Sequence, residues 1–291
     1  MFVASLIAPP GMLDASLVNS LRNAWGGGVV DWLGIDEAAE FTLDLIPYNR
    51  WKVWQDLQAL QVDLIVQPSQ NRRKKMLLAD MDSTMIQQEC IDELADEAGI
   101  GEHVKAITVR AMNGELDFEE ALLERVYGLK GQSSSIIERV LGKRITFMPG
   151  AAVLLATMKA NGGYAALVSG GFTAFTKKVA DSLGFDEHHA NRLLIEDGHL
   201  TGKVGCPILG RQAKVDALET ITSRLEIEAS DVIAVGDGAN DLGMLGCAGT
   251  GVALHAKPSV AAECDVRVNF GDLTALLFLQ GYGSHQFVEP Y

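Results

Sequence analysis

The sequence of 291 residues predicts an α/β protein: a core with a parallel sheet and an inserted helical cap, preceded by a small β-α-β-β-α-β domain. Two observations predict the core. Short apolar runs alternate with helical patterns from residue 149 onward, as in sheets covered by helices on both faces. A charged helical stretch then separates the first such strand from the others, which makes it an insertion. The polar segment 67–71, which contains Pro68, separates core and front domain.

The front domain is expected to span residues 1–72. It has a helical pattern with Leu13, Leu17 and Leu21 at four-residue spacing. The other expected elements are strands at Phe2–Ala8, Val29–Leu33, Phe41–Ile46 and Val62–Val66, and a helix at Arg50–Leu60. This order folds four strands against two helices.

The core is expected to comprise residues 75–85 and 149–291, and the helical cap residues 86–148. Met76–Ala79 has the continuous apolar character of a buried parallel strand. Further core strands are expected at Ala165–Val168, Val232–Val235 and Val252–Leu254, and helices after Pro149 and at Thr173–Leu183 and Lys214–Arg224.

Composition limits the classes of partner. Apolar residues make up 48% of the chain and charged residues 21%, which is ordinary for a globular protein. A net charge of −14 repels phosphate backbones and anionic lipids, so we expect neither nucleic acid nor membrane as a partner. The four scattered cysteines, without a C-x-x-C pair, predict reduced, mostly buried thiols in a cytoplasmic protein.

Polar motifs follow the apolar strand runs. They are Asp80-Met81-Asp82-Ser83-Thr84, Ser169-Gly170-Gly171, a stretch leading to Lys214, and Gly236-Asp237-Gly238-Ala239-Asn240-Asp241. In open parallel sheets the ligand binds beyond the carboxyl ends of the strands. We therefore expect these motifs to converge at one edge of the sheet.

The first motif predicts a nucleophile and a proton-transfer group. Asp80 and Asp82 are two residues apart, so on an extended chain their side chains point the same way. One carboxylate can attack phosphorus while the other handles the proton of the leaving group. The structural alternative is a helix cap by an acidic residue, Ser83 or Thr84.

The acidic residues also predict a metal ion. Asp237 and Asp241 offer the oxygen ligands that Mg²⁺ prefers. Like charges about 4 Å apart repel by about 4 kcal/mol at an effective dielectric constant of about 20, so the gathered aspartates require a divalent cation and a fixed positive side chain. Lys214 is the natural candidate for that side chain. Alternatively, Lys214 lies on a solvated helix face.

Ser169-Gly170-Gly171 predicts an anion site. A hydroxyl group and two backbone N–H groups just before a helix form a cradle suited to phosphate.

Together and in this order, the motifs resemble the haloacid dehalogenase superfamily, most closely its phosphoserine phosphatase branch, over residues 75–291. The resemblance implies a Rossmann-like core and Mg²⁺ as cofactor. It implies that Asp80 forms an aspartyl-phosphate, and that Asp82 acts as general acid and base with its backbone carbonyl on the metal. Asp237 would be a further metal ligand. Ser169, Gly170, Lys214 and Asn240 would bind substrate, supported by Asp241.

The resemblance also implies the substrate, phosphoserine. Glu89 would bind its ammonium group and Arg125 its carboxylate, a geometry suited to guanidinium. Met112 and Phe118 match apolar positions lining that pocket. The structural alternatives are a first-turn helix acid for Glu89, a surface ion pair for Arg125, and plain core for Met112 and Phe118.

The front domain resembles small amino-acid-binding regulatory domains, although a packing or dimerisation module fits it as well. A homodimer is therefore left open. Two other functions are also left open: the same chemistry on phosphohomoserine or phosphoethanolamine, and a non-catalytic amino-acid sensor.

Overall fold

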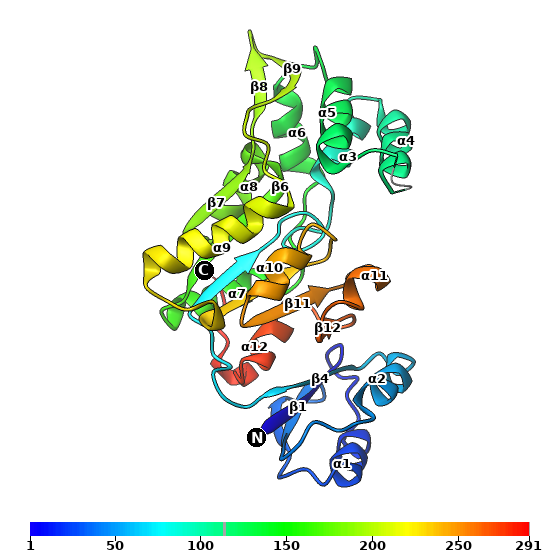
Figure 1. The fold of residues 1–291 in the computed structure, drawn as a ribbon, viewed down its shortest axis with the longest axis vertical. Coiled ribbons are helices and arrows are strands. Elements are labelled where there is room, and N and C mark those ends of the chain that lie inside the picture. Colours follow the sequence, from blue (N-terminus) through cyan, green and yellow to red (C-terminus); the bar gives the residue numbers. More distant parts are fainter. Residues whose placement is uncertain (113–114, 291) are drawn as a thin grey trace. The chain divides into compact units, whose positions relative to one another are not determined.

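The computed structural model describes residues 1–112 and 115–290, with the side chain of Met112 outside the described set. The chain divides into two compact units (Figure 1). The first unit comprises Met1–Leu77, Pro149–Tyr164 and Thr222–Tyr291, and the second comprises Leu78–Met148 and Ala165–Ile221. In the described part of the chain, no helix combines the length and apolar character needed to cross a membrane.

The front domain has the predicted β-α-β-β-α-β order. Its elements are β1 (Phe2–Ile7), α1 (Ala15–Ala24), β2 (Asp31–Gly34), β3 (Ala38–Leu43), α2 (Arg50–Gln58) and β4 (Asp63–Pro68). The strands form an antiparallel sheet in the order β2-β3-β1-β4. The second strand begins two residues later than expected and the third ends three residues earlier, because Val29 and Leu45, 89% and 78% exposed, are apolar residues of loops.

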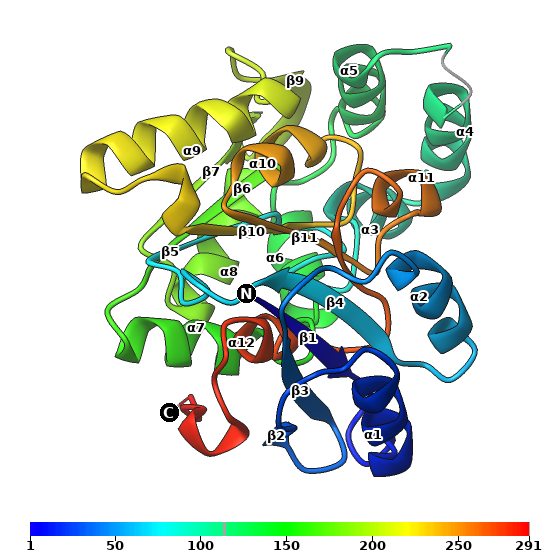
Figure 2. The ribbon, with the colours of Figure 1, turned by 60° about the horizontal axis from the view of Figure 1, so that its bottom comes forward.

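Both faces of this sheet are covered. Leu6 of β1 packs with Val18 of α1 and Leu57 of α2 on one face. On the other face lies α12 (Ala275–Leu279), which contacts β1 (Figure 2). Phe278 of α12 approaches Gly34 so closely that a Cβ at that glycine would lie 3.0 Å from its ring. Strand β1 is therefore buried on both sides, which explains why Ser5 is its only polar residue.

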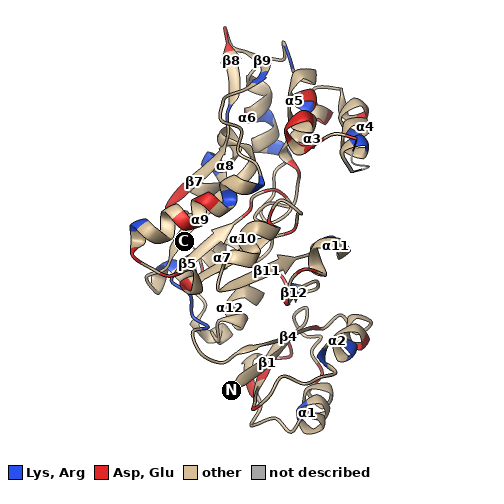
Figure 3. Ribbon diagram, viewed as in Figure 1, with Lys and Arg blue, Asp and Glu red and all other residues tan. Residues whose placement is uncertain are grey.

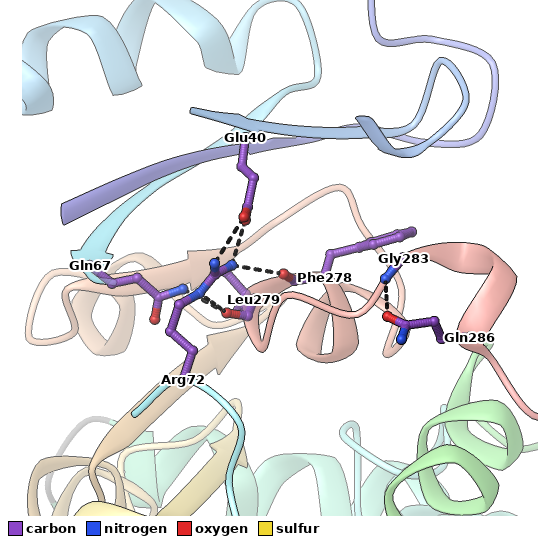
Figure 4. A network of polar contacts seen from close by, with 7 residues as sticks. All are labelled: Glu40, Gln67, Arg72, Phe278, Leu279, Gly283 and Gln286. Atoms are coloured by element: carbon purple, nitrogen blue, oxygen red, sulfur yellow. Dashed lines mark hydrogen bonds and ion pairs between the residues drawn. The ribbon is translucent and has the colours of Figure 1, made fainter. Parts of the chain in front are cut away.

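Arg72 links the front domain to α12 (Figure 4). Its guanidinium group makes a two-pronged ion pair with Glu40, with Nη1 donating to Oε1 at 2.9 Å. It also donates to the backbone carbonyls of Leu279 at 3.0 Å and Phe278 at 3.2 Å. Gln67 donates to the same Leu279 carbonyl at 2.8 Å.

Asp63 makes a second buried link in this unit. Its carboxylate accepts backbone N–H bonds from Asn269 at 2.8 Å and from Phe270 and Gly271 at 3.0 Å each. Burial raises the pKa of Asp63, and the three N–H bonds oppose that rise.

The predicted core sheet is present, with strand order β12-β11-β10-β5-β6-β7. The pairs β10–β11, β11–β12 and β6–β7 are parallel. The strands are β5 (Met76–Ala79), β6 (Tyr164–Phe172), β7 (Glu187–Asn191), β10 (Val232–Gly236), β11 (Thr250–Leu254) and β12 (Val266–Val268). The core helices are α7 (Ala151–Ala160), α8 (Thr173–Leu183), α9 (Arg211–Leu225), α10 (Leu242–Cys247) and α11 (Pro258–Ala261).

The predicted cap region is helical and lies in the second unit. It contains α3 (Cys90–Glu97), α4 (Gly101–Met112), α5 (Phe118–Gly128) and α6 (Ser135–Lys143). Asp117 and Glu120 cap each other's backbone N–H groups at the start of α5. Figure 3 shows charges of both signs on α5 and on core helix α9.

A hairpin that the sequence analysis did not predict packs against this cap. It consists of β8 (Leu193–Glu196) and β9 (His199–Val204), and β9 contacts α5. Its backbone carbonyl at Leu200 accepts the N–H of Gly131 at 2.8 Å. The hairpin therefore joins the helical insertion to the core within the second unit.

All four cysteines are free thiols. Cys90 and Cys264 are buried, but Cys206 and Cys247 are exposed, so the expectation of mostly buried thiols is wrong for half of them.

Candidate active site

Asp80 and Lys214 form a buried ion pair in the second unit. Asp80 directly follows β5, and Lys214 lies in the first turn of α9. Lys214 Nζ is 2.6 Å from Asp80 Oδ1, and the two side chains are 1% and 8% exposed. Because both side chains are almost fully buried, removing either one would take a close charge partner from the other. Lys214, the predicted fixed positive side chain, therefore contacts Asp80, the predicted nucleophile.

Asp82 lies two residues after Asp80, in the core segment that precedes the cap. Its Oδ1 accepts the backbone N–H of Cys90, the first residue of α3, at 3.3 Å. Burial and the negative charge of Glu89 raise the pKa of Asp82 to about 7, while hydrogen bonds from Cys90 and the charge of Lys214 oppose the rise. A carboxyl group with a pKa near neutrality can both give and accept a proton.

The Ser169 motif lies beside Asp82. Ser169 is 2% exposed, and its Oγ accepts the backbone N–H of Gly171 at 2.8 Å. A Cβ at position 171 would lie 2.9 Å from Asp82 Oδ2 and 3.0 Å from Ser169 Oγ. Glycine is therefore required here for close approach of the Asp82 carboxyl group to the end of β6.

Glu89 is oriented by the motif that contains the two aspartates. Ser83 adopts a left-handed backbone with φ of 55°, and its hydroxyl group donates to Glu89 Oε1 at 2.7 Å. A left-handed conformation is unfavourable for a residue with a side chain, so this turn is maintained by its surroundings. Glu89 precedes α3, and its side chain makes no capping hydrogen bond to that helix. Its carboxylate accepts the hydrogen bond of the Ser83 hydroxyl group instead.

Arg125 lies on α5 with a largely buried guanidinium group. Its Nε donates to the carbonyl of Ala121 at 3.1 Å, and among the described residues no hydrogen bond is made by its two Nη groups. Burial lowers its pKa, while the carboxylates of Asp92, Glu89 and Asp82 oppose that shift. The two outer nitrogens of the guanidinium group thus remain available for a bidentate contact.

Of the two apolar residues predicted to line the pocket, Phe118 has a described side chain and Met112 does not. Phe118 is 37% exposed, and a Cβ at Gly210 would lie 3.3 Å from its ring. That exposure does not fit the alternative of plain core. Met112 ends α4, and its side chain lies outside the described residues.

The remaining predicted residues follow β10 in the first unit. Asp241 is fully buried, and its Oδ2 accepts the N–H of Gly238 at 2.9 Å. A Cβ at Gly236 would collide with the Asp241 carboxyl group. Asp237 and Asn240 are partly exposed on the same turn.

Two residues that sequence reasoning missed contact this site. Cys90 bonds Asp82 as described above, and Asn191 donates to the backbone carbonyl of Gly170 at 2.9 Å. Asn191 ends β7, whose sequence Glu-His-His-Ala-Asn has no apolar run, so the criterion that found the other motifs does not apply to it.

A family model of haloacid dehalogenase-like hydrolases matches residues 77–246, more than half of the chain. This chain is a haloacid dehalogenase-like hydrolase. The hydrolase is 47% identical over 204 residues to a phosphoserine phosphatase of Haemophilus influenzae. That alignment covers 70% of this chain and 65% of the relative, slightly less than two thirds of its length.

Solved structures resemble the hydrolase over most of its length. A HAD family hydrolase of Salmonella enterica serovar Typhi has a TM-score of 0.87 at 32% identity, covering 96% of this chain and 98% of that chain. A phosphoserine phosphatase that represents an analogue of a phospho-aspartyl intermediate has a TM-score of 0.66 at 42% identity, covering 71% of this chain and 98% of that chain. The resemblance to this family drawn from the motifs is thereby confirmed.

Proposed function

We propose that this hydrolase is a Mg²⁺-dependent phosphoserine phosphatase, which converts O-phospho-L-serine and water to L-serine and phosphate as the last step of serine biosynthesis. The observation that carries the proposal is the buried Asp80–Lys214 pair. It combines a carboxylate that can act as nucleophile with a cation that can neutralise a phosphoryl group. The phosphoserine phosphatases among its relatives support the choice of substrate.

The reaction proceeds in two displacements. An oxygen of Asp80 attacks phosphorus, the bond from phosphorus to the serine oxygen breaks, and Asp82 gives its proton to that oxygen. Water then attacks the phosphorus of the aspartyl-phosphate, Asp82 takes its proton, and the bond to Asp80 breaks to release phosphate. A pKa of about 7 suits Asp82 to both proton transfers.

Lys214 and the Ser169-Gly170 segment hold the phosphoryl oxygens in this proposal, with Asn240 as a further substrate contact. A cation and fixed N–H donors placed where charge develops stabilise the transition state more than they stabilise the bound substrate.

The donor set fits Mg²⁺. Asp80, Asp237 and Asp241 offer carboxylate oxygens, the ligands that this ion prefers. We assign Asp80, Asp82 through its backbone carbonyl, and Asp237 as ligands, with Asp241 in support. When bound, the ion supplies positive charge that neutralises the phosphoryl oxygens.

Glu89 and Arg125 select the substrate. Ser83 holds the Glu89 carboxylate, which would receive the ammonium group of phosphoserine. The Nη groups of Arg125, without hydrogen bonds among the described residues, would receive its carboxylate. Met112 and Phe118 are assigned to the apolar lining. The cytoplasmic location remains a prediction, and the homodimer remains an open alternative.

The test is phosphate release from L-phosphoserine, phosphoethanolamine and p-nitrophenyl phosphate, with Mg²⁺ and with EDTA. We expect phosphoserine to be preferred in kcat/KM by at least about a hundredfold, or about 2.7 kcal/mol, and EDTA to abolish turnover. Similar turnover of all three esters would refute the proposed substrate. No turnover of any ester with Mg²⁺ would refute the proposed enzyme and favour the sensor.

A further inference from the structure

The side chain of Asn191 connects three segments of the second unit: β7, β6 and the residues just before α9. It is the last residue of β7, pairs in register with Phe172 of β6, and is 1% exposed. Its Nδ2 donates to the carbonyl of Gly170 at 2.9 Å and to that of Leu209 at 3.1 Å. Its Oδ1 accepts the N–H of Leu209 at 2.7 Å.

This bonding pattern requires a carboxamide. A carboxamide has two N–H donors and an accepting oxygen, and here both kinds of group are used. Aspartate, of the same size, lacks the donors when ionised, and serine is too short to span two segments. The residue type is thus set by the bonds it makes, and at 1% exposure a buried amide needs such partners.

The two segments that Asn191 joins both lead to phosphate-binding groups of the proposed function. Gly170 follows Ser169, whose Oγ is held by the N–H of Gly171. Leu209 precedes α9, whose first turn carries Lys214 on the Asp80 carboxylate. The amide of Asn191 therefore links the segment that contains Ser169 and Gly170 to the start of the helix that bears Lys214.

We propose that Asn191 is a positioning residue for phosphoryl transfer, which fixes the cradle at Ser169 and Gly170 relative to the helix that bears Lys214. This inference rests on the proposed phosphatase function and extends it to a residue that does not touch the substrate. Its effect should be confined to the groups that hold the phosphoryl oxygens, because none of its bonds reaches Glu89, Arg125 or the segments that hold them.

The experiment compares Asn191→Ala with the matched control Gln67→Ala in the full chain with Mg²⁺. Gln67 is also a buried carboxamide that donates to a backbone carbonyl, that of Leu279, but it lies in the front domain. We expect Asn191→Ala to lower kcat by about a hundredfold, the scale of a misplacement of about 1 Å. The factor should be the same for phosphoserine and p-nitrophenyl phosphate, while Gln67→Ala keeps the wild-type kcat.

Rates are measured well below the unfolding temperature of each variant, so loss of stability alone does not change kcat. Wild-type kcat in folded Asn191→Ala would overturn the positioning role, as would a loss confined to phosphoserine. If Asn191→Ala does not fold, Asn191→Asp, which keeps the size but loses the donors, is held to the same outcomes. A wild-type protein inactive on every ester would refute the proposed function instead.

Discussion

Lys214 Nζ lies 2.6 Å from Asp80 Oδ1, and the two side chains are 1% and 8% exposed. The two charges are separated by 134 positions in the sequence, the difference between 214 and 80. Burying a lone charge costs several kcal/mol, so each side chain is held there by the other. The pair also places a cation beside the group that would attack phosphorus.

The first prediction concerns this pair. Asp80→Asn should abolish phosphate release, because an amide oxygen is a poor nucleophile and cannot form the aspartyl-phosphate. Steady-state phosphate release with L-phosphoserine and Mg²⁺ measures the effect. Asp216→Asn, an exposed change on the same helix as Lys214, is the control. Wild-type-like turnover in Asp80→Asn would eliminate this residue as nucleophile.

The second prediction concerns selectivity. Arg125→Ala should raise the KM for phosphoserine by about 10- to 150-fold, the worth of hydrogen bonds between charged groups. The KM for phosphoethanolamine, which lacks a carboxylate, should change little. Arg110→Ala is the matched control, since Arg110 is a half-exposed cap arginine already paired with Glu124. An equal loss on both substrates would mean that Arg125 does not read the carboxylate.

The third prediction concerns pH and stability without metal. The pKa of Asp82, about 7 when folded against a reference of 3.8, is raised by burial and by Glu89. The folded state therefore binds this proton more tightly than the unfolded chain does. The stabilising contribution is fully present below pH 3.8 and is lost as pH rises through about 7.

Asp82→Asn should accordingly be more stable than wild type at about pH 8.5, by roughly 2–4 kcal/mol, and gain little at about pH 4. Chemical denaturation in EDTA at both pH values measures the free energy of unfolding. Mg²⁺ should reduce the difference, because a bound cation favours the ionised carboxylate. A gain independent of pH would contradict the assignment of the shift to Asp82.

The fourth prediction concerns the attachment of the front domain (Figure 4). Arg72→Ala should cost about 3–5 kcal/mol of unfolding free energy, because it leaves Glu40, 14% exposed, without its partner. The comparison variant is Arg73→Ala. Arg73 is exposed and its guanidinium group stacks on the ring of Tyr282, so its loss should cost about 1 kcal/mol or less. The kcat of both variants should match wild type below their unfolding temperatures.

A double-mutant cycle separates the pair from the other bonds of Arg72. Glu40→Ala combined with Arg72→Ala should be less destabilising than the sum of the single changes by about 1–3 kcal/mol. Strict additivity would mean that the carbonyl bonds to Leu279 and Phe278 carry the whole effect.

The hairpin β8–β9 was missed although its signal is present. Asp197 and Gly198 both have positive φ, 49° and 74°, as the tight hairpin turn between two strands requires. These two strands are partly exposed and carry polar residues, so they lack the apolar runs that mark the expected core strands. In the front domain the opposite error occurred, where exposed Val29 and Leu45 extended the expected strands.

The sequence by itself determined the family, the order of the elements and the residue types of the candidate site. It could do so because strand and helix periodicity are local, and because the D-x-D-S-T and G-D-G-A-N-D motifs carry their chemistry within a few residues. Only the tertiary structure decided which partners each group has: Asp80 on Lys214, Asp82 near Glu89, Arg72 on Glu40, and Asn191 between β6 and the segment before α9. Pairings, burial and the pKa of Asp82 depend on atoms distant along the chain, so local patterns do not contain them.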